Sequence, residues 1–206
     1  MPSYKLTSFK GRGRAEVARE MLYLVDAPYE EERVHMDKWP SHLPGPDHSD
    51  VPMLEVNGKK LGQPFAIYRF LAHELGFAGS SPLEAAQIDS LAEEHREYED
   101  EMDPLMAVLF GYSKGDKAKM VKEVGEPARD RYFPGLEKIA KKHGRSGHFI
   151  GISLTWVDLL IAEHVSLIDH FFPGFLSDYP NVMKITKKIL ETPRLVEWAK
   201  KRNENH

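Results

Sequence analysis

The chain has no cysteine among its 206 residues. This absence excludes disulfide bonds, thiolate metal ligands and a cysteine nucleophile. The sequence also lacks an apolar run long enough to span a bilayer, and its first residues lack the apolar core of a signal peptide. We therefore expect a cytoplasmic protein that does not enter a membrane.

Strong charge of one sign is missing as well. The formal net charge is −4 and there is no long run of Lys and Arg, so the chain offers no positive surface for nucleic acid. Ten histidines are present, but we find no spacing between them and carboxylates that indicates a metal site. The remaining composition, with 41% hydrophobic and 29% charged residues, is typical of a globular chain that buries a core.

Residues 51–61 carry the densest local signals. Val51 precedes a proline, which favours an extended backbone and allows a cis peptide bond, so this residue can present its own N–H and C=O to a ligand. Residues 53–56 then alternate in polarity, and Asn57-Gly58 is a strong hairpin signal before the chain returns. We expect two antiparallel strands here.

A helix is predicted directly after this hairpin. Pro64 suits the first helical position, and Ile67, Phe70 and Leu71 recur at helical spacing. A turn, a free strand edge and a helix N-terminus that lie close together make a site for a peptide-like ligand with a carboxylate.

The whole chain separates into two predicted domains. Strand signals at residues 4–9 and 29–35 flank a helical pattern, and with the hairpin and its helix they follow the order of a thioredoxin-like α/β domain at residues 1–76. Residues 77–82, which contain Gly, Ser and Pro, form a linker. Residues 83–206 show only helical patterns, which predicts an all-α C-terminal domain.

One motif in the second domain predicts a helix start. Thr155-Trp156-Val157-Asp158 has the form of a capping box and opens the most apolar helix of the chain. In such a box Thr155 accepts from the N–H three residues on, and Asp158 reaches back to the Thr155 N–H. We interpret this motif as structural.

A known family has a pattern similar to the hairpin segment. The glutathione site of the cytosolic glutathione transferases resembles Val51-Pro52-Met53-Leu54-Glu55-Val56-Asn57-Gly58, followed by Leu61-Gly62-Gln63. The sigma class, which includes haematopoietic prostaglandin D synthase, is most similar, and its nematode members look closest. The resemblance covers nearly the whole chain, and it implies the glutathione transferase architecture, glutathione as co-substrate, no metal and a homodimer.

The resemblance places two residues near the sulfur of glutathione. Ser8 stands where sigma members carry the tyrosine that donates a hydrogen bond to the thiolate, and Arg14 matches an arginine whose charge favours the thiolate. The serine hydroxyl is shorter than a phenol, so two interpretations of Ser8 stay open. It is either a modified thiolate donor or an ordinary residue at the end of a strand.

The remaining parts of the tripeptide are matched by five positions. The resemblance implies that Trp39 meets the glycine end, that the Val51 backbone beside cis-Pro52 pairs with the cysteinyl amide, and that Gln63 holds the γ-glutamyl portion. Glu97 corresponds to an acid that reaches across the dimer to the γ-glutamyl amino group, although its residue type alone equally fits a solvated helix face.

Three further positions depart from the family pattern. Leu43 and Asp50 stand where sigma members often carry a cation or an amide, and both changes oppose an anionic ligand. Pro64 replaces a serine whose hydroxyl and N–H both bind the γ-glutamyl carboxylate. The helix tolerates Pro64 at its first position, but the contacts are lost.

Three functions are weighed on this basis. The leading one is a glutathione transferase that joins the glutathione thiol to a small apolar electrophile, with a weakened glutathione site. The second is a homologue of low or no activity that binds apolar ligands. The third is a structural role, as in the lens crystallins of the sigma class, which nothing in the composition favours.

Overall fold

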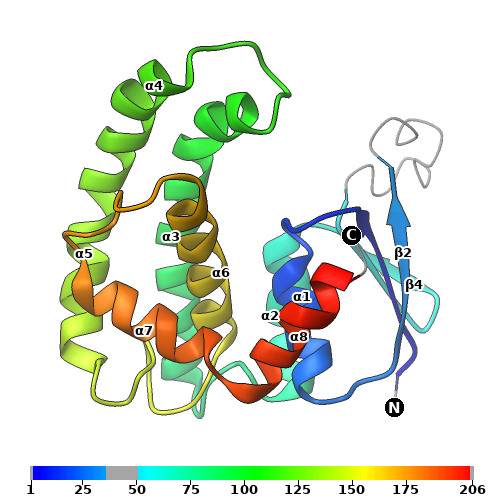
Figure 1. The fold of residues 1–206 in the computed structure, drawn as a ribbon. Helices are drawn as coiled ribbons and strands as arrows, with labels where there is room; N and C mark the ends of the chain where they lie inside the picture. Colours follow the sequence, from blue (N-terminus) through cyan, green and yellow to red (C-terminus); the bar gives the residue numbers. More distant parts are fainter. Residues whose placement is uncertain (1, 36–50, 205–206) are drawn as a thin grey trace. The chain divides into compact units, whose positions relative to one another are not determined.

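The computed structural model describes residues 2–35 and 51–204, and side chains as far as residue 202 (Figure 1). The contacts group the chain into two compact units, which do not follow the chain order. The first unit comprises Met1–Ala78, Leu154–Leu159 and Ile189–His206, and the second comprises Gly79–Ser153 and Leu160–Lys188. Each unit is described by itself.

The first unit contains a four-stranded sheet. Its strands are β1 (Tyr4–Phe9), β2 (Tyr29–Val34), β3 (Met53–Val56) and β4 (Lys59–Leu61), in the order β2-β1-β3-β4. The β1 and β2 strands are parallel, while the other two pairs are antiparallel. The predicted hairpin is therefore confirmed, and β2 lies at an edge of the sheet.

One side of this sheet is covered by helices. Figure 1 shows α1 (Glu16–Leu24), α2 (Pro64–Leu75) and α8 (Pro193–Glu204) on the same side of the strands. The α2 helix buries one apolar face, as its periodicity predicted. The α1 helix is buried at every position from Glu16 to Leu22, its charged residues included. The core between sheet and helices is fully buried at Leu6, Leu54, Met21, Ile67 and Leu71.

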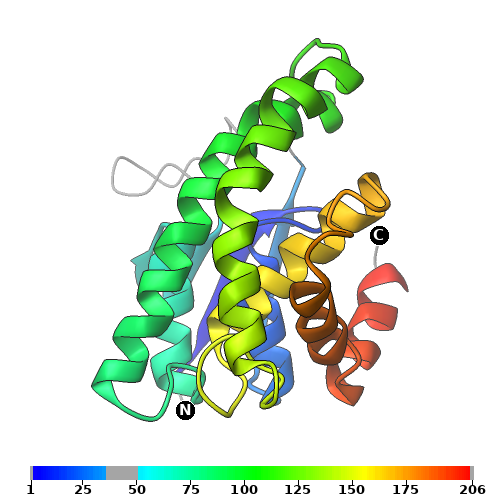
Figure 2. The same cartoon turned by 90° about the vertical axis from the view of Figure 1, so that its left-hand side faces the viewer.

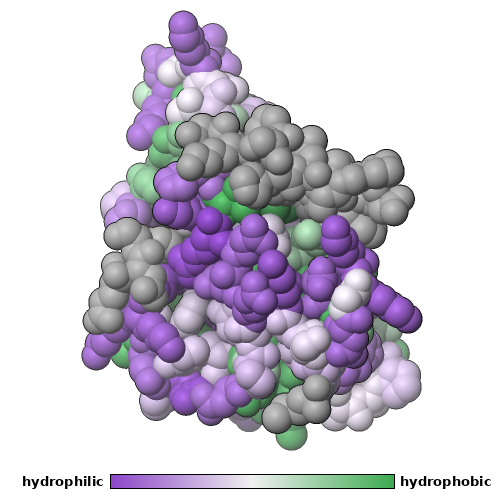
Figure 3. All heavy atoms as spheres, turned by 90° about the vertical axis from the view of Figure 1, so that its right-hand side faces the viewer, coloured by the Kyte–Doolittle hydropathy of each residue, from purple (hydrophilic) through white to green (hydrophobic). Residues whose placement is uncertain are grey.

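The other side of the sheet is polar. Figure 3 shows hydrophilic side chains across the middle of this face of the molecule. On the sheet itself, the Lys5 ammonium lies 3.3 Å from a Glu30 oxygen and 3.2 Å from a Glu32 oxygen. Along β1 the residues on the helix-covered face are all buried, whereas Lys5 and Phe9 on the other face are only half-buried.

The second unit is helical. It contains α3 (Pro82–Leu109), α4 (Lys117–Met120), the π-helical segment η2 (Val121–Gly125), α5 (Glu126–His143), and most of α6 (Trp156–Phe171) and of α7 (Pro180–Leu190). Figure 2 shows α3 and α5 side by side and running in opposite directions. All strands of the described chain lie before residue 62, which confirms the α/β and all-α fold class.

The helical segment at residues 117–143 has a wider turn inside it. The chain is helical throughout, but residues 121–125 form a π-helical turn between α4 and α5. Pro127 has no N–H to donate to the carbonyl four residues before it, and a π turn is one way in which a helix accommodates such a gap.

The capping box of α6 forms with one difference from its predicted pattern. Asp158 Oδ2 accepts from the Thr155 N–H at 2.8 Å, as predicted, and also from the Thr155 hydroxyl at 2.8 Å. The Asp158 N–H donates to the Thr155 carbonyl at 3.1 Å. Both residues are fully buried, so the Asp158 carboxylate satisfies polar groups that water does not reach.

The domain ranges remain a prediction. They assign everything after residue 82 to the helical domain, whereas α8 and the start of α6 group with the sheet. The reason lies in α8, where the Arg194 guanidinium donates to the carbonyl of Tyr23 at 2.6 Å and to the carboxylate of Asp26.

Among the described helices, none is both long and apolar enough to cross a bilayer.

Candidate functional site

Two segments of the hairpin region bring backbone groups to the predicted ligand site. The Val51–Pro52 peptide bond is cis, as the resemblance implied. Val51 is half-buried and precedes the ladder in which β3 pairs with β1. Since β3 lies between β1 and β4, the predicted free strand edge of the hairpin belongs to β4.

The start of α2 forms the second part of the region. Gln63 is exposed and has φ 68°, a left-handed backbone that a non-glycine residue rarely adopts. The first intrahelical bond runs from the Ile67 N–H to the Gln63 carbonyl at 3.0 Å. Pro64 at the first position removes one of the N–H groups that a helix start offers to an anion.

The turn that carries Arg14 is held against α2. Arg14 is exposed and lies just before α1, and its carbonyl accepts a hydrogen bond from the Tyr68 hydroxyl. Tyr68 is buried on α2, one turn after its start. The contact therefore fixes the backbone of the Arg14 turn relative to the helix that begins after Gln63.

Ser8 lies in a buried network of charges. Its side chain is 2% exposed, and its hydroxyl accepts from the Arg19 guanidinium and donates to the Phe9 carbonyl at 3.3 Å. Arg19 also donates to Glu16 at 2.9 Å and to Glu31 at 2.5 Å. The hydroxyl is thus engaged inside the protein, which favours the structural interpretation of Ser8.

The two carboxylates hold this network in its charged form. Burial lowers the pKa of Arg19, but the charges and hydrogen bonds of Glu16 and Glu31 outweigh it and leave the pKa raised. For Glu16 the directions are reversed. Burial raises its pKa, but Arg19, Arg202 and Trp198 together lower the pKa below its usual value. Arg19 therefore stays charged and forms salt bridges that join α1 to β2.

The other predicted residues divide between the two units. Glu97 is exposed on α3, in the second unit. The structure thus places Ser8, Arg14, Val51, Pro52 and Gln63 in the first unit, around the end of β1 and the start of α2. Trp39, Leu43 and Asp50 lie outside the described residues.

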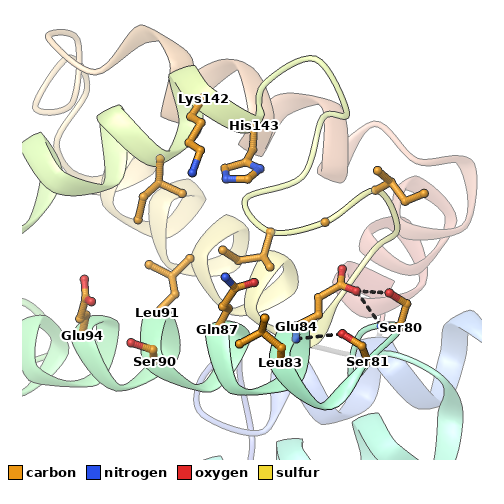
Figure 4. Close-up of a pocket in the computed structure, with 14 residues that line it drawn as sticks. Ser80, Ser81, Leu83, Glu84, Gln87, Ser90, Leu91, Glu94, Lys142 and His143 are labelled. Atoms are coloured by element: carbon orange, nitrogen blue, oxygen red, sulfur yellow. Dashed lines mark hydrogen bonds between the residues drawn. The ribbon is translucent and has the colours of Figure 1, made fainter.

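A separate cavity of about 600 Å³ lies in the second unit. Figure 4 shows it between the first half of α3, the end of α5 and the loop at residues 150–152. Glu84 at its edge accepts from the Ser80 N–H at 2.8 Å, while the Ser81 hydroxyl accepts from the Glu84 N–H at 3.2 Å. None of the described glutathione-site candidates lines this cavity.

Sequence analysis missed two groups in the second unit. The spacing Ser81-Pro82-Leu83-Glu84 is a capping signal, and it could have been read from the sequence. A cluster of His95, Glu99 and His164 was also missed, because its third member comes from another helix and is 65 positions further along the chain. Only the spacing of four between His95 and Glu99 was visible beforehand.

Comparison with known families matches most of the chain. Residues 4–73 match the family model described as glutathione S-transferase, N-terminal domain. Residues 99–202 match the model described as glutathione S-transferase, C-terminal domain.

Curated relatives are similar over their full length. The chain is 38% identical to glutathione S-transferase 1 of Ascaris suum over 202 residues, which cover 98% of each chain. It is 37% identical to probable glutathione S-transferase 6 of Caenorhabditis elegans, again over 98% of each chain.

Solved structures share the fold. A glutathione S-transferase from Ascaris lumbricoides is 38% identical and has a TM-score of 0.91 over 98% of each chain. A monomeric glutathione S-transferase from Necator americanus is 37% identical, with a TM-score of 0.92 over 97% of each chain. Prostaglandin synthase D of Nilaparvata lugens is 26% identical, with a TM-score of 0.85 over 98% of this chain and 99% of that one.

Proposed function

The chain belongs to the glutathione S-transferase family, and from this premise we propose that it transfers the thiol of glutathione to small apolar electrophiles. The observation that carries the proposal is the arrangement inside the matched N-terminal domain. Val51 precedes β3, and Gln63 in a left-handed conformation precedes α2, so one short segment supplies both backbone groups and a side chain to a peptide-like ligand.

The proposed roles of single residues are those that the family pattern implies. Val51 pairs through its backbone with the cysteinyl amide of glutathione, and Gln63 holds the γ-glutamyl portion. Trp39 meets the glycine end, and Glu97 of the partner subunit binds the γ-glutamyl amino group. Each role is carried over from the family pattern.

Arg14 is the proposed thiolate-stabilising group. It is exposed, and the hydrogen bond from Tyr68 to its carbonyl holds its turn against α2, the helix that begins after Gln63. A cation within a few ångströms lowers the pKa of a thiol by about 1–3 units. The buried Ser8 hydroxyl instead accepts a hydrogen bond from Arg19. The positive charge of Arg14 is therefore the group that stabilises the thiolate in this proposal.

We also propose that the glutathione site is weak. Pro64 offers neither the hydroxyl nor the N–H of the family serine, and Leu43 and Asp50 supply no positive charge to the ligand. Two or three lost charge-assisted hydrogen bonds correspond to a few kcal/mol, or roughly a hundredfold or more in affinity.

Finer features of the proposal rest on the family resemblance. They are membership of the sigma class, a role in detoxification, a cytoplasmic location and a symmetric homodimer. The Necator americanus neighbour is described as monomeric, so the mass of this protein in solution is the measurement that tests the homodimer.

A second function is favoured by one observation. Because the Ser8 hydroxyl is engaged by Arg19 and is 2% exposed, this position supplies no donor to a thiolate at the surface. A chain that keeps the fold without this donor fits a binding protein for apolar ligands with little turnover.

Conjugation of a chlorinated dinitrobenzene to glutathione distinguishes the two functions. We expect turnover in the parent chain, a loss of about tenfold or more in Arg14→Gln because less thiolate forms at neutral pH, and no loss in Lys10→Gln. Lys10 is an exposed cation next to the same turn and serves as the matched control. If the parent binds glutathione but shows no turnover, the binding-protein function is correct.

A further inference from the structure

Three side chains with metal-binding chemistry meet inside the second unit. His95 and Glu99 lie one turn apart on α3, and His164 comes from α6. His95 Nε2 is 3.6 Å from Glu99 Oε1, and His164 Nδ1 is 3.5 Å from the same oxygen. All three donor atoms lie within 4.8 Å of one another.

These distances fit a small cation between the donors. Zinc forms bonds of about 2.0–2.2 Å to imidazole nitrogen and carboxylate oxygen, which separates tetrahedral ligands by about 3.3–3.5 Å. Two of the three separations are already close to that range. Small rotamer adjustments therefore bring the three atoms to bonding distance of one ion.

The burial of the cluster leaves polar atoms without partners. His95 is fully buried, and among the described residues its Nε2, the nitrogen that faces Glu99, accepts or donates no hydrogen bond. Such orphaned groups are costly in a protein interior. The Glu99 side chain is 21% exposed, so the cluster has one side that faces solvent and gives an ion a route in.

A neighbouring hydroxyl orients one of the rings. Tyr132 Oη lies 3.0 Å from His95 Nδ1 and the Tyr132 ring packs against His95, with 5.4 Å between ring centres. When Nδ1–H donates to this hydroxyl, the lone pair of Nε2 points toward Glu99. Metal-binding histidines are held by this kind of outer hydrogen bond.

We propose that His95, Glu99 and His164 bind one zinc ion, with water as the fourth ligand. The ligand set is of the nitrogen and oxygen type that zinc accepts, and it contains no thiolate. The proposal is independent of the glutathione site, because all three ligands belong to the second unit.

A titration of metal-stripped protein with zinc sulfate tests the proposal. Calorimetry should give one zinc per chain, and Co²⁺ in place of zinc should give the visible absorption of a tetrahedral nitrogen and oxygen site. Glu99→Gln keeps the size of the side chain and its ability to hydrogen-bond, but it should weaken zinc binding by about a hundredfold or more. Tyr132→Phe removes only the outer hydroxyl and should weaken binding by about tenfold.

His170→Gln is the matched control. His170 lies on the same helix α6 but is exposed and outside the cluster, so its removal should leave zinc binding unchanged. Three results overturn the proposal: a parent chain without the Co²⁺ spectrum, unchanged zinc affinity in Glu99→Gln, or an equal loss in His170→Gln. The Co²⁺ spectrum of the parent decides the matter even if a variant fails to fold.

Discussion

At the scale of single residues, the length of a side chain decides what Ser8 can do. A phenol at the end of β1 extends several ångströms further than a hydroxymethyl group. The serine oxygen instead stays in the interior, where the Arg19 guanidinium donates to it. The sequence shows the substitution, but the direction of the hydroxyl depends on Arg19, Glu16 and Glu31, which only the fold brings together.

We predict that Ser8→Ala lowers stability and leaves turnover nearly unchanged. The Arg19 guanidinium loses a buried acceptor, which costs about 1.5–3 kcal/mol for a hydrogen bond to a charged group. Urea unfolding measures this loss, and the conjugation assay measures kcat. A tenfold fall in kcat with unchanged stability would instead make Ser8 the thiolate donor.

At the scale of elements, the start of α6 depends on one carboxylate. Asp158 accepts two hydrogen bonds from Thr155 and is fully buried, so its removal leaves the Thr155 N–H and hydroxyl without their acceptor. We predict that Asp158→Ala lowers the free energy of unfolding by about 2–3 kcal/mol, and Asp158→Asn, which keeps an acceptor oxygen, by less. Thermal unfolding compares the three proteins, and equal midpoints would show that the cap contributes nothing.

A second carboxylate joins α1 to α8. Glu16 Oε1 accepts from the Trp198 indole at 2.8 Å and from Arg202 at 2.9 Å, and its other oxygen accepts from Arg19. Glu16 is 2% exposed. Removing one partner from such a buried ion pair costs about 3–5 kcal/mol. We expect Glu16→Gln to lose about that much at neutral pH in urea unfolding, and the exposed Glu30→Gln to lose less than about 1 kcal/mol.

The same carboxylate makes stability depend on pH. Its pKa in the folded protein lies below the usual value of 4.5, so its stabilisation is fully present above about pH 4.5. The stabilisation is lost as the pH falls through the folded pKa. The gap in unfolding free energy between the parent and Glu16→Gln should therefore narrow below pH 4.5, and a gap that stays constant to pH 3 would contradict this role.

At the scale of the whole molecule, local patterns predicted most elements and tertiary contacts explain the rest. The ends of β1 and β2 and the start of α2 lie within one residue of the sequence predictions, because prolines, glycines and polar caps mark such ends locally. The grouping of α8 with the sheet depends on contacts of Arg194 and Glu16 across more than 150 positions. The cluster of His95 and His164 likewise has no local signal.

The proposed homodimer is a prediction at this scale. Light scattering at micromolar concentration should give twice the chain mass of 23.5 kDa. Glu97→Gln should then weaken glutathione binding, because the exposed Glu97 carboxylate acts on the site of the partner subunit. A mass of one chain, together with unchanged glutathione affinity in Glu97→Gln, would contradict both statements.

Calorimetric titration with glutathione tests the central claim most directly. We predict one weak site per chain in the parent, and an affinity about tenfold to a hundredfold higher in Pro64→Ser, since a regained charge-assisted hydrogen bond contributes about 1.5–3 kcal/mol. Pro82→Ser makes the same change at the first position of α3 and should leave the affinity unchanged. The absence of binding in both the parent and Pro64→Ser would contradict a glutathione site at the start of α2.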